Sequence, residues 1–85
     1  MLKVRRTIYV NDRQFTVWLG LVNKNKQMNN YTVYLISDDP NSSLSHAEKI
    51  LSGIESKEEA IKKGVSYTKR LYRNILDNQD NQGDE

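Results

Sequence analysis

The sequence contains no cysteine and only one histidine, His46. Without cysteine no disulfide framework is available, and one histidine cannot supply the ligand set of a structural zinc site. His46 lies in a serine-rich polar segment, where an ordinary surface position is the favoured interpretation. We therefore expect no metal site. The lack of cysteine also fits a cytoplasmic protein, including one made in a phage-infected cell.

Glycine and long apolar runs are scarce as well. The four glycines stand far apart, at 20, 53, 64 and 83, so no glycine-rich phosphate loop is present. No apolar run approaches the roughly 20 residues that span a bilayer, and the start of the chain lacks the apolar stretch of a signal peptide. Adjacent carboxylates occur at 38–39 and 58–59, where turns and helix starts already favour acids. We expect a protein that is not an enzyme, needs no cofactor and does not contact a membrane.

What is present is a chain of 85 residues with the alternating pattern of β-strands in its first half. Apolar and polar residues alternate from about Lys3 to Val10, and again over 15–22 after a turn cluster at 11–14. A polar, asparagine-rich loop follows over 23–30. Residues 31–37 are β-branched and aromatic, as in a third strand. The pattern predicts a three-stranded antiparallel sheet.

The register of this sheet can be predicted because cross-strand partners must share a face. Pairing Val10 with Phe15, and Asn23 with Tyr31, gathers the aliphatic side chains on one face, with Arg6 as the one interruption. The opposite face then contains no acid. Its members are Lys3, Arg5, Thr7, Tyr9, Thr16, Trp18, Gly20, Val22, Thr32, Tyr34 and Ile36.

The segment 43–52 has two interpretations. Ser45 to Glu48 forms a capping box that would open a short helix to Leu51, with Gly53 as its stop, and a fourth strand over 47–51 fits almost as well. A second capping box at Ser56–Glu59 predicts that a long helix begins at Lys57. Its apolar stripe recurs at spacings of three and four, as required to cover the aliphatic sheet face. The stripe comprises Ala60, Ile61, Val65, Thr68, Leu71, Tyr72, Ile75 and Leu76.

The predicted fold is therefore α+β, with the sheet packed on one long C-terminal helix in a single domain over 1–77. Residues 78–85 contain no apolar side chain and predict a disordered acidic tail. Gly20 and Gly64 lie inside predicted elements, where glycine costs about 0.5–1 kcal/mol, so each suggests a close backbone approach. A helix crossing the sheet would explain Gly64.

Charge is segregated along the chain. Residues 1–37 hold six basic residues and one acid, and residues 62–76 hold five basic residues and no acid. Such segregation favours a surface that faces a polyanion. Our leading hypothesis is a small non-enzymatic nucleic-acid-binding or regulatory module, encoded by a phage or mobile element, that uses the basic and aromatic sheet face. The predicted contact residues are Lys3, Arg5, Arg6, Tyr9, Arg13, Trp18, Lys24, Lys26 and Tyr34.

Other functions fit the same residues. The first alternative is a protein-binding inhibitor or adaptor, for example a phage product that blocks a host enzyme or defence complex, with Trp18, Tyr34 and Ile36 as its hot spot. A weaker one is a homodimer joined through the edge of the third strand. The segment 41–53 or a dimer partner could also simply cover the face that carries Trp18 and Tyr9.

The order of elements and the start of the last helix, Gly53 to Ala60, resemble the arm-site DNA-binding domains of phage integrases. Those domains lay a three-stranded sheet in a groove of DNA, so the resemblance implies DNA binding through the sheet. It covers only the topology and the helix start. The third strand here lacks basic residues, and we assign the chain to no family.

Overall fold

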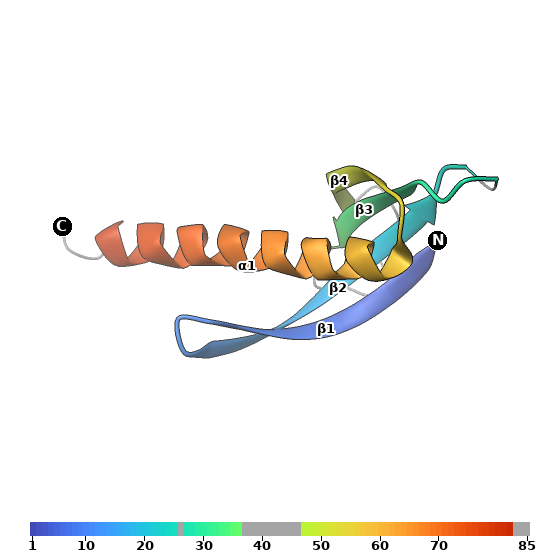
Figure 1. The fold of residues 1–85 in the computed structure, drawn as a ribbon. Helices are drawn as coiled ribbons and strands as arrows, with labels where there is room; N and C mark the ends of the chain where they lie inside the picture. Colours follow the sequence, from blue (N-terminus) through green and yellow to red (C-terminus); the bar gives the residue numbers. More distant parts are fainter. Residues whose placement is uncertain (26, 37–46, 83–85) are drawn as a thin grey trace.

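A computed structural model of the chain describes residues 1–25, 27–36 and 47–82, with residues 80–82 described through their backbone alone. It contains the strands β1 (Leu2–Val10), β2 (Arg13–Asn23), β3 (Tyr31–Ile36) and β4 (Ala47–Ile54), followed by the helix α1 (Lys57–Gln82). The strands form one antiparallel sheet in the order β1-β2-β3-β4. The predicted α+β class is confirmed, with four strands packed on one C-terminal helix. We call the sheet face that α1 covers the inner face, and the opposite one the outer face (Figure 1).

The hairpin between β1 and β2 turns more tightly than the sequence led us to expect. Val10 pairs with Arg13 and Ile8 with Phe15, so the predicted pairing of Val10 with Phe15 is wrong by two residues. The reason lies in Asn11 and Asp12, whose φ angles are 51° and 63°. Two successive positive φ angles belong to the two-residue type I′ turn, whose twist matches that of the flanking strands. A shift of two residues keeps every side chain on its predicted face.

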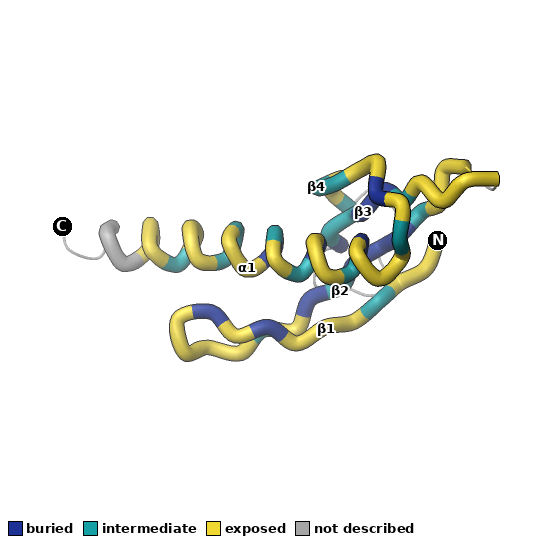
Figure 2. The backbone as a smooth tube through the Cα atoms, in the orientation of Figure 1, coloured by how far each residue is buried: buried dark blue, intermediate teal, exposed yellow. Residues whose placement is uncertain are grey.

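The core lies between the inner face and α1. Ile8, Val10 and Val17 form one buried cluster towards the hairpin tip, and Leu19, Leu21, Val33, Ile54 and Ala60 form another. Buried and exposed positions alternate over the last four residues of β1, from Thr7 to Val10, next to the hairpin turn (Figure 2). The aliphatic face expected from the sequence is thus the packed one. The predicted pairing of β2 with β3, which sets Asn23 against Tyr31, is also confirmed.

Gly64 allows the helix to lie directly on the sheet. A Cβ atom at this position would be 3.1 Å from a methyl group of Leu19 and 3.1 Å from one of Val33, both fully buried. One turn later, the buried Thr68 donates its hydroxyl hydrogen to the Gly64 carbonyl over 2.8 Å, which satisfies a polar group that the core could not otherwise hold. The close approach predicted at Gly64 is confirmed.

Residues 47–54 form the strand β4, so the short-helix interpretation is wrong for residues 47–52 and the fourth-strand alternative is confirmed. The first capping box falls partly outside the described residues, as does His46. Pairing of β4 with β3 shifts register between Tyr31 and Val33 and between Val33 and Tyr34, which marks two irregularities typical of edge strands. Because β4 occupies the free side of β3, the proposed homodimer through the β3 edge is contradicted.

The helix α1 begins at Lys57 as predicted. The Ser56 hydroxyl accepts a hydrogen bond from the Glu59 amide over 3.4 Å, and Glu58 and Glu59 occupy the first turn. The helix continues to Gln82, five residues beyond the expected end at Asp77, since no glycine or proline stands between Asp77 and Gly83. Residues 78–82 are therefore helical rather than the start of a disordered tail, and residues 83–85 lie outside the described part of the chain.

Candidate nucleic-acid interface

The antiparallel register assembles the outer face from rows of directly paired residues. One row runs Lys3, Gly20, Tyr34, Lys49 across the four strands. The next row places Arg5 opposite Trp18, which in turn pairs with Ile36. Thr7 with Thr16 and Tyr9 with Gln14 complete the face towards the hairpin tip. Cations and aromatic rings from four strands thus share one side of the sheet.

Exposure divides this face in two. Along β1, Lys3, Arg5 and Tyr9 are exposed, with 67% of Tyr9 accessible. Trp18 and Tyr34 are half-buried. Side chains held in this way lose less rotamer freedom when they bind a partner than fully exposed ones do.

The β2–β3 part of the outer face is more closed than the sequence led us to expect. Ile36 is only 5% accessible and Thr32 only 4%. Over Gly20, the Met1 thioether occupies the space that a Cβ atom would need, which confirms the close approach predicted there. Of the segment 41–53, which could have covered this face, residues 47–53 instead extend the sheet at its edge, and residues 41–46 lie outside the described part of the chain.

The electrostatic character of the outer face comes from three cations. Lys3, Arg5 and Lys49 lie on it, and none of the strand residues described on this face carries a carboxylate. Lys49 was missed by the sequence reasoning, which left its segment open between helix and strand. That Lys49 lies on the outer face follows only from its pairing with Tyr34.

Three of the predicted contact residues do not join this face, and a fourth lies outside the described residues. Arg6 lies on the inner-face side of β1, and its guanidinium donates a hydrogen bond to the Arg5 carbonyl over 2.8 Å. Arg13 also lies on that side, with its guanidinium carbon 5.7 Å from the centre of the Phe15 ring. Lys24 belongs to the β2–β3 connection, and Lys26 lies outside the described residues. Of the predicted set, the structure places Lys3, Arg5, Tyr9, Trp18 and Tyr34 together on the outer face.

The connection that carries Lys24 is organised by asparagine side chains. The Asn23 carboxamide oxygen accepts hydrogen bonds from the amides of Asn25, at 3.2 Å, and Asn30, at 3.1 Å. The Lys24 amide donates to the Asn30 carbonyl over 2.8 Å, which closes the loop. This loop stands at the opposite end of the sheet from the β1–β2 turn (Figure 1).

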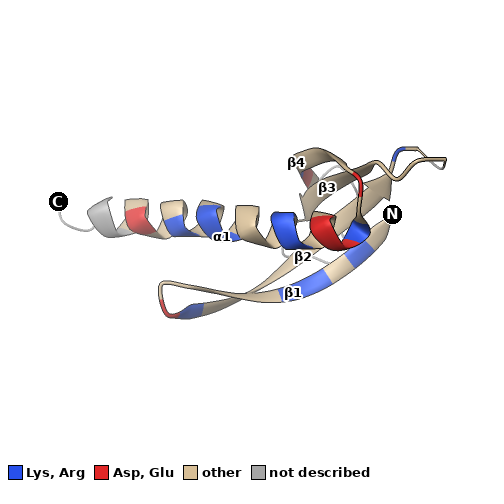
Figure 3. Ribbon diagram, viewed as in Figure 1, with Lys and Arg blue, Asp and Glu red and all other residues tan. Residues whose placement is uncertain are grey.

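A second basic surface lies on α1, on the side turned away from the sheet. Figure 3 shows blue segments along α1 between a red segment in its first turns and another towards its C-terminal end. Lys63 forms an exposed ion pair with Glu59 at 3.9 Å. The exposed basic residues of this stretch are Lys62, Lys63, Lys69, Arg70 and Arg73. Because α1 covers the inner face, this surface and the outer face of the sheet lie on opposite sides of the molecule.

Among residues 1–25, 27–36 and 47–82, no group of three or more histidine or acidic residues is arranged to hold a metal ion. The helix found in this part of the chain is too polar to cross a membrane. Comparisons with protein families, with curated proteins and with solved structures found no match to this chain.

Proposed function

We propose that this protein binds single-stranded nucleic acid on the outer face of its sheet. The observation that carries the proposal is the register, which brings Lys3, Tyr34 and Lys49 into one row and Arg5 beside Trp18 in the next. Proteins that bind single strands combine a basic surface that follows the phosphates with aromatic side chains on which bases stack. The outer face of this sheet carries both components.

The basic and the aromatic residues of the outer face would contact different parts of the nucleic acid. Lys3, Arg5 and Lys49 would contact phosphates, which positions the strand without reading its sequence. Trp18 and Tyr9 would stack on bases. Tyr9 is four residues from Arg5, the partner of Trp18, which separates the two rings by about 13 Å along the strands. Two rings at this separation would contact bases that are not adjacent in the strand.

The protein-binding alternative has less support on this face. Its hot spot required Trp18, Tyr34 and Ile36 together, but Ile36 is 5% accessible and offers almost no surface to a partner. Hot-spot residues contribute by entering a pocket of the partner, which a buried side chain cannot do.

Trp18 is the only tryptophan in the sequence, so its fluorescence reports directly on the proposed site. We expect oligothymidine of about 15 nucleotides to quench this emission in low salt, because base stacking on the indole places the two π-systems in contact. A hairpin duplex of the same length is the comparison, since its bases are already stacked and should quench less.

Tyr67→Phe is a suitable control variant, because Tyr67 lies on α1 and not on the outer face. It should leave the quenching curve unchanged, whereas Arg5→Ala should shift it to higher oligonucleotide concentration. The absence of quenching by single-stranded DNA and by RNA at micromolar protein in low salt would refute the proposed function.

A further inference from the structure

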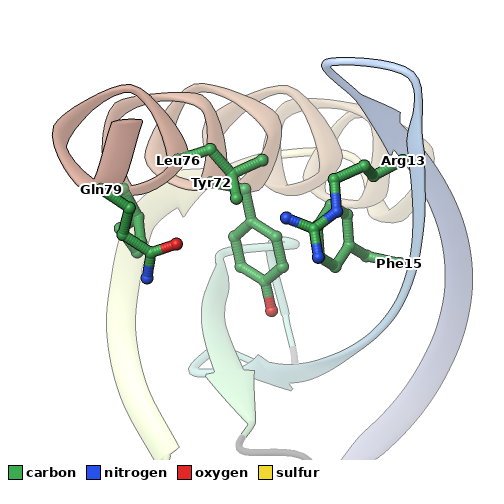
Figure 4. A pocket seen from close by; sticks show the side chains of 6 residues that line it. Arg13, Phe15, Tyr72, Leu76 and Gln79 are labelled. Carbon is green, nitrogen blue, oxygen red and sulfur yellow. The ribbon is translucent and has the colours of Figure 1, made fainter. Parts of the chain in front are cut away.

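A groove lies on the other side of the molecule, between the β1–β2 hairpin and the C-terminal half of α1. It is lined by Arg13, Phe15, Tyr72, Ile75, Leu76 and Gln79 and has a volume of about 320 Å³ (Figure 4). That volume is at the lower end of the range found for ligand pockets. The residues lie on the inner-face side of the hairpin and on α1, so the groove shares none of its lining with the outer-face residues Lys3, Arg5 and Trp18.

The walls of the groove are apolar and fixed in place. The rings of Phe15 and Tyr72 meet edge to face, with centroids 5.0 Å apart and planes at 84°. Leu76 and Tyr72 also pack on the cluster of Ile8, Val10 and Val17. Such contacts hold the walls in one arrangement before any ligand arrives.

The groove is open to solvent, and the hairpin beside it is joined to α1. Ile75 lies on the apolar stripe of α1 and yet is 45% accessible. The hairpin tip is tied to the helix by a hydrogen bond that the Asn11 carboxamide donates to the Asp77 carboxylate over 3.2 Å. An exposed apolar side chain beside a preformed concave surface is typical of a binding site.

The charge in the groove has one sign. Arg13 lies over the Phe15 ring, and Figure 4 shows its guanidinium on the side of Tyr72. None of the described residues that line the groove is acidic. A guanidinium held in this way presents a planar fork of donors that matches a carboxylate.

We propose that this groove binds a peptide segment of a protein partner in which one large apolar side chain stands next to a carboxylate. The apolar side chain enters between Phe15, Tyr72 and Leu76, and the carboxylate meets Arg13. A peptide fits better than a free small molecule, because the exposed Arg13, Ile75 and Gln79 leave the groove open, whereas small ligands are usually enclosed over most of their surface. The chain's own acidic end, residues 77–85, has no apolar side chain to insert.

The test is a titration of ¹⁵N-labelled protein with the peptide acetyl-Gly-Phe-Glu-Gly-amide, followed by amide chemical shifts. We expect saturating shifts confined to the residues around the groove. Exchanging the peptide's glutamate for glutamine should weaken binding by about threefold or more, as expected for loss of a partly exposed ion pair. Exchanging its phenylalanine for alanine should abolish the shifts.

Two protein variants distinguish binding of the peptide in the groove from non-specific attraction of an acidic peptide to a basic protein. Arg13→Gln should erase the preference for glutamate over glutamine. Arg70→Gln removes the same charge from an exposed position on α1 outside the groove and should leave the preference intact. Thermal melts would establish that both variants are folded.

Three results would overturn the proposal. They are the absence of groove shifts up to the solubility limit of the peptide, equal affinity for both peptides, and equal effects of the two variants. The outcome of the peptide titration does not depend on nucleic-acid binding, because that binding is measured separately, at the outer face. Sedimentation at several protein concentrations tests the competing occupant, since a second copy in the groove would give self-association and exclude the peptide.

Discussion

At the scale of single residues, the turn at Asn11 and Asp12 decides the register of the longest strand pair. Both residues have positive φ. Asparagine and aspartate tolerate this conformation better than other non-glycine residues, but it still costs free energy that glycine avoids. The sequence predicted the turn cluster and the two faces of the sheet, because the apolar alternation alone decides on which face each strand residue lies. It did not predict the register, because nothing in the apolar pattern distinguishes a two-residue turn from a four-residue one.

We predict that Asp12→Gly stabilises the protein by about 0.5–1 kcal/mol, because Asn-Gly is the preferred pair in a type I′ turn. Asp12→Val should lower the free energy of unfolding by about 1–2 kcal/mol, since a β-branched residue is strained at positive φ. Urea denaturation measures both. Asp12→Asn is the control for loss of the charge and should have little effect. Destabilisation by Asp12→Gly would argue for the wider loop instead.

At the scale of elements, α1 supplies one side of the core through its apolar stripe. Ile61 packs on the cluster that contains Leu19 and Val33, whereas Lys63 is exposed and forms an ion pair with Glu59 at the surface. We predict that Ile61→Ala lowers the free energy of unfolding by about 2 kcal/mol or more, a large share of the stability of so small a domain. Lys63→Ala should change it by less than about 0.5 kcal/mol. Similar unfolding curves for the two variants would disprove the proposed stripe.

The far end of α1 should contribute little to folding. Beyond Asp77 the sequence has no apolar side chain to bury, and helix ends that lack tertiary packing fray. We therefore predict that a chain ending at Asn78 melts within about two degrees of the full chain. Differential scanning calorimetry of both forms measures this. A larger loss would mean that residues 79–85 dock on the rest of the molecule.

Helix α1 and strand β4 differ in how well the sequence predicted them. The start of α1 was predictable because a capping box, two acidic residues and a long apolar stripe agree. For β4 the local signals conflict, since Ser45 to Glu48 has the pattern of a helix cap although residues 47–54 are extended. Its place in the sheet depends on pairing with β3, which is non-local and irregular. Short segments of this kind cannot be assigned from local propensity alone.

At the scale of the whole molecule, the sequence predicted the side of the sheet on which Lys3, Arg5, Tyr9, Trp18 and Tyr34 meet. It did not predict which positive charges would join them. The apolar alternation places Arg6 on the aliphatic face, and Arg13 has the same parity as Phe15 on that face, so only their charge had included them among the contact residues. The burial of Ile36 and the position of Lys49 on the outer face depend on tertiary packing and could not be predicted.

The outer face and the exposed side of α1 are both basic, so their contributions to the affinity for nucleic acid must be measured separately. If single strands bind on the outer face, the affinity must fall with salt, because each neutralised phosphate releases counterions. Trp18→Ala should cost about 1–3 kcal/mol in binding with little change in this salt dependence, since stacking releases few counterions.

The measurement that tests the central claim most directly is the slope of log affinity for oligothymidine against log salt, compared between Arg5→Ala and Arg70→Ala. Each variant removes one exposed arginine, the first from the outer face and the second from α1. We predict that Arg5→Ala reduces the magnitude of the slope by about 0.7, the value for one phosphate of a single strand, and that Arg70→Ala leaves it unchanged. Equal slopes for the two variants, or a reduction confined to Arg70→Ala, would contradict the assignment of binding to the outer face.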